Sequence, residues 1–343
     1  MKVVVNGRFH AHRPTGMQRY ALSVSERLAD KVRCLKPPVA LRGPAGHLWE
    51  QTILPLSARG RLLWSPNNTG PIASRRHVCT MHDLIPLEHP EWFNPRFAAW
   101  YKWLLPRLAR NLDHVVAISE FTRQRVQELL GVPESRITVV PNGVDAAYHP
   151  RTEGETAAVR SRFELGGNPY LLYVGSLEPR KNLAGLMKAW RIALSGLPNE
   201  VQLVVTGAAG RSAVFAQQTL GEIPPRVKFT SYVPEADLPA LYAGAMAVVY
   251  PSLYEGFGLP VLEAMASGAP VITSSNTSLP EVAGDAAVLV NPHNAEEIAG
   301  AIQTVVASDS LRHTMRTAGL ARARQFSWDR CTLETWRVLE AYA

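Results

Sequence analysis

Short apolar runs rich in β-branched residues recur along the whole chain, and they constrain its fold more than any other feature. They are continuous stretches rather than alternating patterns, which is typical of strands buried on both faces of a parallel sheet. Helical patterns lie between them, so the sequence predicts an α/β chain with doubly wound sheets. We expect strands at 2–5, 62–64, 77–81, 114–118, 137–140, 170–174, 201–206, 227–229, 247–250, 270–273 and 287–290, and helices at 19–28, 95–109, 120–130, 183–193, 258–266 and 295–307.

The strand series occurs twice, with a polar stretch at 151–168 between the two halves. A chain of 343 residues is long enough for two domains of about 150–170 residues each. We therefore expect Rossmann-like domains at 1–165 and 166–325, and a final helix at 326–343 that packs back on the first domain. Ligands of such sheets bind at the carboxyl ends of the strands, so two facing domains are expected to form a cleft.

Composition excludes several classes of protein. The sequence contains no apolar run of the length that spans a membrane, and its first residues read as a strand rather than a signal peptide. The cysteines (Cys34, Cys79 and Cys331) fit neither a zinc-site spacing nor a disulfide framework. A cytoplasmic protein is expected.

The positive charge is concentrated in the first half of the chain. The net charge is +7, and residues 1–150 carry 20 Lys and Arg against 11 Asp and Glu. This imbalance indicates an anionic partner, such as phosphates, a membrane surface or nucleic acid. The stretch 92–110 mixes aromatic and basic residues, which is typical of helices that lie on anionic membranes; the alternative is a core helix with a solvated basic face. No nucleic-acid-binding motif is present, so a nucleic-acid partner is not expected.

The most informative segment is 252–264, which follows the strand at 247–250. Gly256 and Gly258 permit a sharp turn and a close approach of the backbone to a ligand. The helix that follows presents free N–H groups and the positive end of its dipole, which suits a diphosphate. Glu255 and Glu263 are eight residues apart and cannot be neighbours on one helix face, so they mark opposite ends of a ligand. The alternative is a capping acid and a surface glutamate.

A second segment, 175–183, follows the strand at 170–174. Gly175 opens the loop, and Arg180 and Lys181 stand where the loop meets its helix. Two cations there are suited to a departing diphosphate. The sequence contains no Asp-x-Asp motif for a divalent metal, so we expect no metal and no cofactor, with the cations and the helix dipole stabilising the charge. The alternative is an exposed basic pair.

Three further segments carry weaker signals. His82 and Asp83 end a strand in the basic half, where His82 is suited to contact a transferred group and Asp83 to orient it. Asn142 lies in a Pro-Asn-Gly-Val-Asp turn. Gly16 precedes a helix whose N–H groups are suited to an anion. Each has a purely structural alternative: a core histidine, a plain turn and an ordinary loop glycine.

Together and in this order, these segments resemble the large GT-B family of retaining glycosyltransferases that includes bacterial mannosyltransferases of O-antigen and exopolysaccharide assembly. The resemblance covers nearly the whole chain. Its strongest part is the Glu-x7-Glu signature from Glu255 to Glu263, with Gly-Phe-Gly between the two glutamates. Gly-Ser-Leu-Glu-Pro-Arg-Lys-Asn, His-Asp-Leu-Ile-Pro and Pro-Asn-Gly-Val-Asp strengthen it.

The resemblance implies a role for each residue of a donor and acceptor site. Most of these roles concern binding of a nucleotide-sugar donor, and the catalytic set is His82, Asp83 and Glu255. By resemblance, the diphosphate is held by Gly16, Gly175, Arg180 and Lys181; the donor sugar by Glu255, Gly256, Phe257, Gly258 and Leu259; and the nucleotide by Glu263 and by Val233 of Ser231-Tyr232-Val233-Pro234. Arg19, Ser119 and Asn142 line the acceptor side.

The family retains the anomeric configuration, usually by a front-face mechanism in which the leaving phosphate helps to deprotonate the acceptor. Glu255 remains a nucleophile or a stabiliser, and the second role is favoured by its place beside the glycines. The mannosyltransferase-like branch suggests GDP-mannose as donor. A UDP-sugar-dependent transferase and a non-catalytic nucleotide-binding or sugar-phosphate-binding protein stay open. We expect a saccharide or lipid-linked acceptor, and peripheral contact with the anionic inner face of the plasma membrane.

Overall fold

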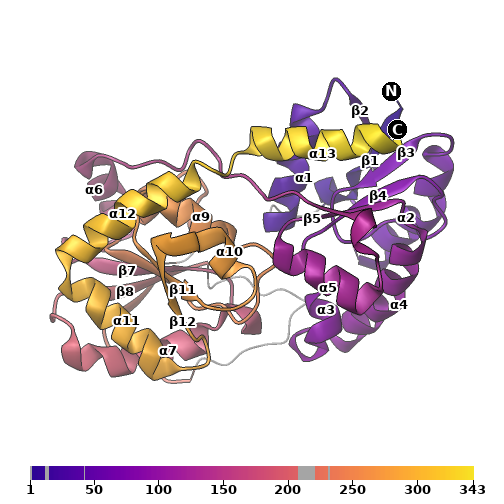
Figure 1. Cartoon of the computed structure of the whole chain (residues 1–343). Coiled ribbons are helices and arrows are strands. Elements are labelled where there is room, and N and C mark those ends of the chain that lie inside the picture. The colour runs from indigo at the N-terminus through magenta and orange to yellow at the C-terminus, as the bar shows by residue number, and fades with distance from the viewer. Residues whose placement is uncertain (1, 12–14, 42, 208–220, 231) are drawn as a thin grey trace. The chain divides into compact units, whose positions relative to one another are not determined.

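The computed structural model describes residues 2–11, 15–41, 43–207, 221–230 and 232–343. The chain forms two compact units (Figure 1). The first unit comprises Met1–Pro90, Pro95–Gly143 and Phe326–Ala343. The second comprises Glu91–Asn94 and Val144–Gln325. Each unit contains one parallel sheet, so the predicted α/β class with two Rossmann-like sheets is confirmed.

The first unit has a six-stranded parallel sheet in the order β2-β1-β3-β4-β5-β6. Its strands are β1 (Val3–Asn6), β2 (Val32–Leu35), β3 (Leu62–Ser65), β4 (His77–Met81), β5 (His114–Ala117) and β6 (Ile137–Val139). Its helices are α1 (Gly16–Arg27), α2 (Gly43–Ser57), α3 (Ile85–Glu88), α4 (Pro95–Asn111), α5 (Glu120–Leu130) and α13 (Trp328–Tyr342). The strand order reverses between β1 and β3, because the chain adds β2 on one side of β1 and the later strands on the other. Such a reversal is the switch point at which these sheets bind ligands.

Successive residues of each buried strand point to opposite faces, and these faces pack on different helices. Val4 and Leu63 pack with Trp49 and Leu54 of α2. Further along the same face, β4 and β5 pack with α4 and α5. On the other face, Thr80 contacts Tyr20 of α1. Helices α2, α4 and α5 therefore cover one face of the sheet, and α1 covers the other.

Strand β2 was not expected from the sequence, which predicted five strands for this unit. Val32–Leu35 forms the edge of the sheet, and only Val32 is buried. A half-exposed edge strand with an arginine in it lacks the continuous apolar run by which the buried strands were recognised. Helix α2 was also missed, because Pro44 and Pro55 interrupt its pattern.

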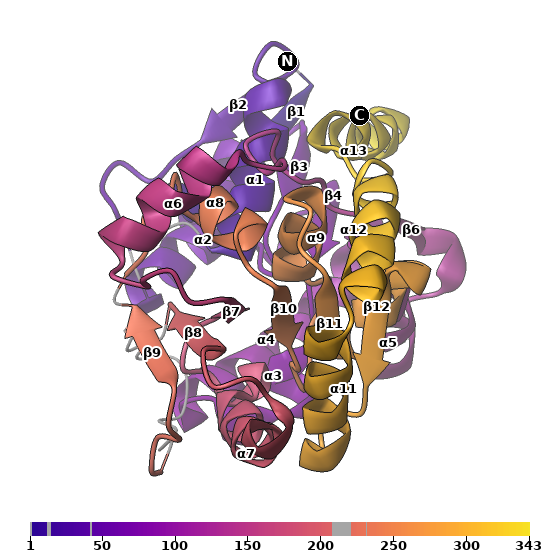
Figure 2. The same ribbon diagram turned by 90° about the vertical axis from the view of Figure 1, so that its left-hand side faces the viewer.

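The second unit has a six-stranded parallel sheet in the order β12-β11-β10-β7-β8-β9. Its strands are β7 (Tyr170–Val174), β8 (Gln202–Thr206), β9 (Val227–Thr230), β10 (Ala247–Tyr250), β11 (Val271–Ser274) and β12 (Ala287–Val290). Its helices are α6 (Glu153–Arg162), α7 (Leu183–Ala193), α8 (Leu238–Ala243), α9 (Leu259–Ala266), α10 (Leu279–Ala283), α11 (Ala295–Ala307) and α12 (Asp309–Ala323). Helices α7 and α11 lie side by side on one face, around the buried Trp190 (Figure 2).

The boundary between the units differs from the one predicted at residue 165, because the second unit already begins at Val144. The polar stretch interpreted as a linker contains helix α6, which packs against α8. Arg160 of α6 donates to the carbonyl of Gly244 at 3.0 Å. Only Thr156 and Val159 of α6 are buried, so a mostly solvated surface helix produced a composition that resembles a linker.

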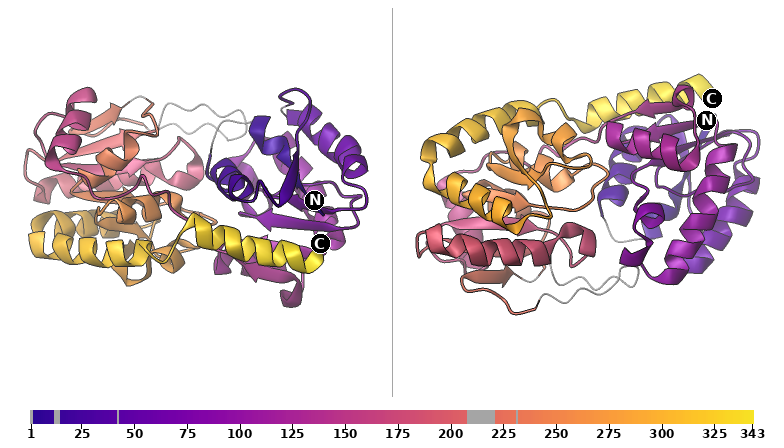
Figure 3. Two further views of the ribbon diagram at one scale, coloured as in Figure 1. Left: turned by 90° about the horizontal axis from the view of Figure 1, so that it is seen from above. Right: turned by 60° about the horizontal axis from the view of Figure 1, so that its bottom comes forward.

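The C-terminal helix α13 belongs to the first unit, where it packs against α1 (Figure 3). The hydroxyls of Tyr20 and Thr335 are 3.4 Å apart, and Arg27 Nε donates to Asp329 Oδ1 at 2.9 Å. Within the described ranges, no helix has both the length and the apolar character needed to cross a membrane.

Candidate active site

Two loops that are distant in sequence meet at the carboxyl edge of the second sheet. Strands β7 and β10 are hydrogen-bonded neighbours, and the strand order reverses between them. Because both strands run in the same direction, the loops 175–182 and 251–258 leave the sheet at the same edge. The backbone N–H of Leu253 donates to the carbonyl of Arg180 at 2.7 Å, which joins the two loops directly.

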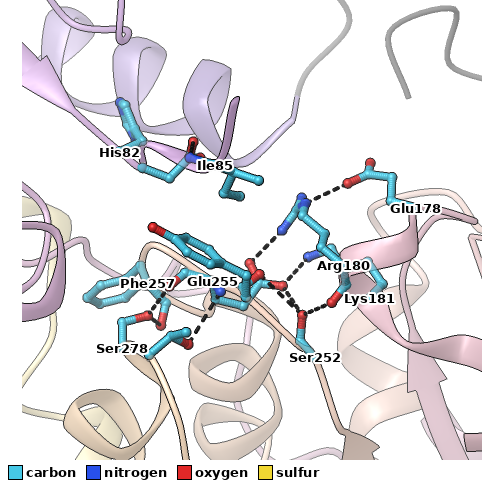
Figure 4. Close-up of polar contacts among 12 residues, drawn as sticks. His82, Ile85, Glu178, Arg180, Lys181, Ser252, Glu255, Phe257 and Ser278 are labelled. Atoms are coloured by element: carbon cyan, nitrogen blue, oxygen red, sulfur yellow. Dashed lines mark hydrogen bonds and ion pairs between the residues drawn. The ribbon is translucent and has the colours of Figure 1, made fainter. Parts of the chain in front are cut away.

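Glu255 is the centre of the cluster that these loops form (Figure 4). Its Oε2 accepts from Arg180 Nη1 at 2.8 Å, and its Oε1 accepts from Lys181 Nζ at 2.7 Å. Oε1 also accepts from the hydroxyls of Tyr250 and Ser252, at 2.8 and 2.7 Å. The two motifs predicted separately, the cation pair and the first signature glutamate, therefore form one ion-pair network.

The electrostatics of this cluster fix its charges. Burial by itself raises the pKa of Glu255, but the adjacent Arg180 guanidinium and Lys181 ammonium outweigh burial and hold it at about 2. Burial and the neighbouring Arg180 lower the pKa of Lys181, against the opposing effect of Glu255. Burial and then the Glu255 charge raise the pKa of Tyr250 well above its ordinary value, so its phenol stays protonated and donates to the carboxylate. Glu255 is thus a carboxylate whose oxygens already accept several donors.

Glu178 is a second carboxylate in the cluster. Its Oε2 accepts from Arg180 Nε at 2.7 Å, and its Oε1 accepts from the Ser176 hydroxyl at 2.5 Å. Arg180 is therefore held from two sides by Glu178 and Glu255 through its fixed guanidinium fork. The two cations are balanced by two carboxylates, so an incoming diphosphate would displace carboxylate contacts on a preformed cation pair.

The glycines of the two loops stand where side chains would collide. A Cβ on Gly175 would come within 2.8 Å of the Tyr173 hydroxyl. Gly258 has a φ of +110° and caps the start of α9, and its Cβ would lie 2.6 Å from Leu279. Gly258 thus permits the sharp turn into α9 that was predicted from the sequence.

The other residues predicted to bind the nucleotide-sugar donor lie in α9, in the loop before it and in the loop after β9. Phe257 is buried. Leu259 begins α9, and Gly256 lies in the loop before it. Glu263 is buried one turn into α9 and accepts from the Tyr242 hydroxyl at 3.1 Å. Val233 is buried beside the exposed Tyr232, and Ser231 lies outside the described residues.

In the first unit, His82 directly follows β4 and its imidazole is buried. Its Nε2 is 2.8 Å from the Pro66 carbonyl, and the ring packs edge-on against Tyr20. Burial lowers the pKa of His82 to about 4, despite the opposing effect of the Pro66 carbonyl. A neutral ring held in this way is suited to orienting the local backbone. Asp83 Oδ1 accepts from the Ile85 N–H at 3.3 Å at the start of α3.

The remaining predicted residues of the first unit lie at element ends. Ser119 is fully buried and caps α5 by accepting from the Thr122 N–H at 3.0 Å. Asn142 is buried, and within the described ranges its side-chain oxygen has no hydrogen-bond partner. Gly16 is the first residue of α1, whose start is fixed by a capping box between Thr15 and Gln18. Arg19 lies one turn into α1 and is partly buried.

A buried polar network at the switch point of the first sheet was not predicted. Glu50 of α2 accepts from Asn6 and Arg8, each at 2.7 Å, and from Thr69 at 3.0 Å. Burial raises the pKa of Glu50, but Arg8 and His47 bring it down to about 2. The available signal was the single acidic residue in the stretch 43–57. In the second unit Glu178, Tyr250 and Ser252 were also missed as partners of the cation pair.

Acidic, histidine and cysteine side chains are the groups that could form a metal site in the described part of both units. No group of three or more His, Cys, Asp or Glu side chains in that part is arranged to hold a metal ion.

Both units match known glycosyltransferase families. Residues 156–322 match the family described as glycosyl transferases group 1, and residues 61–148 match glycosyltransferase family 4. The chain belongs to the group 1 glycosyltransferases and is a glycosyltransferase with the GT-B fold. The resemblance inferred from the sequence motifs is therefore confirmed.

Three individual proteins are similar to this chain over most of its length. O-antigen chain mannosyltransferase B of Escherichia coli is 36% identical over 279 residues, which cover 79% of this chain and 71% of that protein. The serotype-specific mannosyltransferase WbdA of Escherichia coli is 30% identical over 73% of this chain, but only 32% of its own length is covered. Among solved structures, Anabaena HepE in complex with UDP superimposes with a TM-score of 0.77 at 20% identity, over 99% of this chain and 100% of that one.

Proposed function

We propose that this glycosyltransferase transfers a mannosyl residue from GDP-mannose to a saccharide or lipid-linked saccharide acceptor in cell-surface polysaccharide assembly. The observation that carries the proposal is the cation pair Arg180–Lys181, held at the switch point of the second sheet by Glu255. The choice of mannose is supported by the names of the similar O-antigen mannosyltransferases.

In the proposed reaction, the bond between the sugar C1 and the donor phosphate oxygen breaks, and the acceptor oxygen bonds to C1 on the same face. The acceptor proton passes to the leaving phosphate, so the configuration is retained. Arg180, Lys181 and the N-terminal end of α9 neutralise the charge that develops on the diphosphate, without a metal ion. Glu255 is a poor nucleophile because its oxygens accept from Lys181 and Arg180, so we assign it to positioning the cations and the sugar.

A transfer assay tests this function directly. The chain is incubated with GDP-mannose and lipid-linked saccharides from O-antigen-producing cells, with and without EDTA, and the product is analysed by NMR. The proposal predicts α-mannosyl transfer that EDTA does not abolish. β-Linked product would contradict retention, and activity that EDTA abolishes would contradict metal independence.

A UDP-sugar donor is the second candidate. HepE, which shares the fold, was solved in complex with UDP and glucose. Transfer from UDP-glucose but not from GDP-mannose in the same assay would select this candidate. A protein that binds these donors without any transfer would be the non-catalytic alternative.

We also propose that the first unit contacts the anionic inner face of the membrane through a surface formed by α2 and α4. Leu48, Ile53 and Leu56 of α2 are 65%, 51% and 71% exposed, and they lie along one arc of that helix. Trp103 of α4 is 43% exposed and stacks on Trp100. A contact between Trp100 of α4 and His47 of α2 links the two helices.

Charge supports an anionic lipid surface as the occupant. Helix α4 carries Arg96, Lys102, Arg107 and Arg110 and no acidic residue. The Arg107 guanidinium lies 4.7 Å from the centre of the Trp103 ring, so aromatic and basic groups are combined on one exposed stripe. Such a combination inserts apolar groups at the headgroup boundary while its cations attract anionic lipids.

Vesicle flotation checks this surface. We expect the protein to float with phosphatidylglycerol-containing vesicles, to stay unbound with phosphatidylcholine alone, and to lose binding in the double variant Leu48→Ser/Leu56→Ser. The matched control is Leu333→Ser, which changes a leucine that is 50% exposed on α13. Equal flotation with both lipids, or undiminished binding of the double variant, would refute the surface. A concentration-dependent dimer that the double variant abolishes would assign it to a second copy of the chain.

A further inference from the structure

Side chains of the segment 273–278 form hydrogen bonds with the backbone of the loop that contains Glu255, the first glutamate of the Glu-x7-Glu signature. Thr273 Oγ1 donates to the Tyr250 carbonyl at 2.9 Å, and Ser274 Oγ donates to the Ser252 carbonyl at 2.7 Å. Both hydroxyls belong to fully buried residues at the carboxyl end of β11, which pairs with β10. Side chains of one strand therefore bind the backbone of its neighbour after the regular ladder ends.

The same pattern continues beyond the strands, where the loop turns toward α9. Asn276 Nδ2 donates to the Leu253 carbonyl at 2.9 Å. The Ser278 hydroxyl lies 2.9 Å from two carbonyl oxygens, those of Glu255 and Phe257 (Figure 4). Ser278 is fully buried, so in the folded chain its hydroxyl replaces water as the hydrogen-bond partner of these two carbonyls. The polar side chains of 273–278 thus follow the carbonyls of 250–257 from the strand end to the glycine turn.

The backbone of this segment is strained next to Ser278. Thr277 has a φ of +57°, which a β-branched residue rarely adopts. Its Oγ1 accepts from the Glu255 N–H at 3.4 Å. Strain of this kind persists where surrounding contacts over-determine it, and it clusters at functional sites. The strained residue here is in direct contact with the backbone of the glutamate that binds both cations.

We propose that Ser278 is a positioning residue for sugar transfer: by binding the carbonyls of Glu255 and Phe257, it fixes the loop that presents the Glu255 carboxylate and the Gly256–Leu259 backbone to the donor sugar. This inference rests on the proposed function, because it assigns the donor sugar to that loop. Each carbonyl shares a peptide plane with the N–H of the next residue, so holding these two carbonyls also fixes the directions of the Gly256 and Gly258 N–H groups. A loop held by one buried hydroxyl keeps this arrangement before the donor binds.

The effect is expected on the reaction step rather than on nucleotide binding. The diphosphate cations Arg180 and Lys181 lie on the other loop, whereas the Ser278 hydroxyl bonds to the carbonyls of Glu255 and Phe257. Relaxation of the Glu255–Phe257 backbone therefore displaces the groups around the sugar most, while Glu178 continues to hold Arg180 on the other loop. Small displacements of reacting groups cost up to about 100-fold in rate.

The test compares Ser278→Ala with Ser267→Ala. Ser267 is a fully buried serine at the end of α9, and its hydroxyl has no hydrogen-bond partner in the part of the chain that is described. We expect Ser278→Ala to lower kcat roughly 10- to 100-fold, with the dissociation constant for the nucleoside diphosphate changed by less than about 3-fold. Ser267→Ala is expected to keep the kcat of the unmodified chain.

Two results would overturn the proposal: an unchanged kcat in folded Ser278→Ala, or equal losses in kcat and nucleotide affinity, which indicate general damage. Should Ser278→Ala not fold, Asn276→Ala replaces it, because Asn276 is only partly buried and supports the same loop through Leu253. An unchanged kcat in that variant would then count against the segment.

Hydrogen exchange separates this inference from the proposed function. Ser278→Ala is expected to speed amide exchange of 255–259 relative to Ser267→Ala, whether or not the chain transfers sugar. Faster exchange without any transfer by the unmodified chain would mean that the proposed function has failed while the positioning contact is real. Identical exchange in both variants would refute the positioning contact itself.

Discussion

Glu255→Gln is expected to lower the turnover number of sugar transfer roughly 100- to 1,000-fold while the protein stays folded. The amide keeps the size of the side chain but removes the charge that pairs with Arg180 and Lys181 at 2.8 and 2.7 Å. The cations lose their shared anchor, and the donor sugar loses a carboxylate. Steady-state kinetics with the established donor measure the effect.

The same substitution is expected not to weaken nucleotide binding. The cluster of Glu178, Arg180, Lys181 and Glu255 is balanced in charge, so removal of one carboxylate leaves a net positive site that attracts a diphosphate more strongly. The control is Glu296→Gln on the exposed start of α11. If Glu255→Gln had the same turnover number as the unmodified enzyme, Glu255 would not belong to the site.

Arg180→Ala is expected to lower kcat/KM roughly 30- to 1,000-fold, which corresponds to a loss of about 2–4 kcal/mol of transition-state stabilisation. The guanidinium stabilises charge that grows on the diphosphate as the sugar leaves, and alanine provides no donor. Arg180→Lys should recover only part of the loss, because an ammonium cannot reproduce the fork that binds Glu178 and Glu255 together. Kinetics at saturating acceptor measure these differences.

The control for Arg180 must separate lost catalysis from an uncompensated carboxylate. Arg180→Ala leaves Glu178 without its guanidinium, which by itself destabilises the loop. Addition of Glu178→Ala to that variant relieves this problem but does not restore a diphosphate ligand. Recovery of full activity in the double variant would show that Arg180 acts only as a counter-ion of Glu178. Arg191→Ala, at an exposed arginine of α7, should be silent.

The sequence predicted those parts of the fold that depend on local pattern. Buried strands such as β7 and β10 appear as continuous apolar runs, and α5 and α7 were placed with the bounds that the structure has. The edge strand β2 and the solvated helix α6 were missed, because half-exposed elements lack a distinct apolar run. Local sequence patterns therefore predict buried helices and strands better than half-exposed ones.

The candidate site shows the same limit. The cations Arg180 and Lys181 and the carboxylate Glu255 were each recognised beside strand ends, since a strand end followed by glycine is a local signal. Their pairing across 74 or 75 residues depends on β7 lying next to β10, which periodicity does not encode. Ser278 was missed for the same reason, because its importance comes only from the two carbonyls that it reaches.

The second unit is expected to bind a nucleotide-sugar diphosphate at Arg180 and Lys181. The most direct measurement is a thermal-shift screen, without added metal, against GDP, UDP, ADP, TDP and their common sugars, on the unmodified chain and on Arg180→Ala. A ligand that binds only the folded state raises the melting temperature. We predict selective stabilisation by GDP and GDP-mannose that is largely lost in Arg180→Ala. No stabilisation by any nucleotide, or an equal response of both proteins, would contradict the claim.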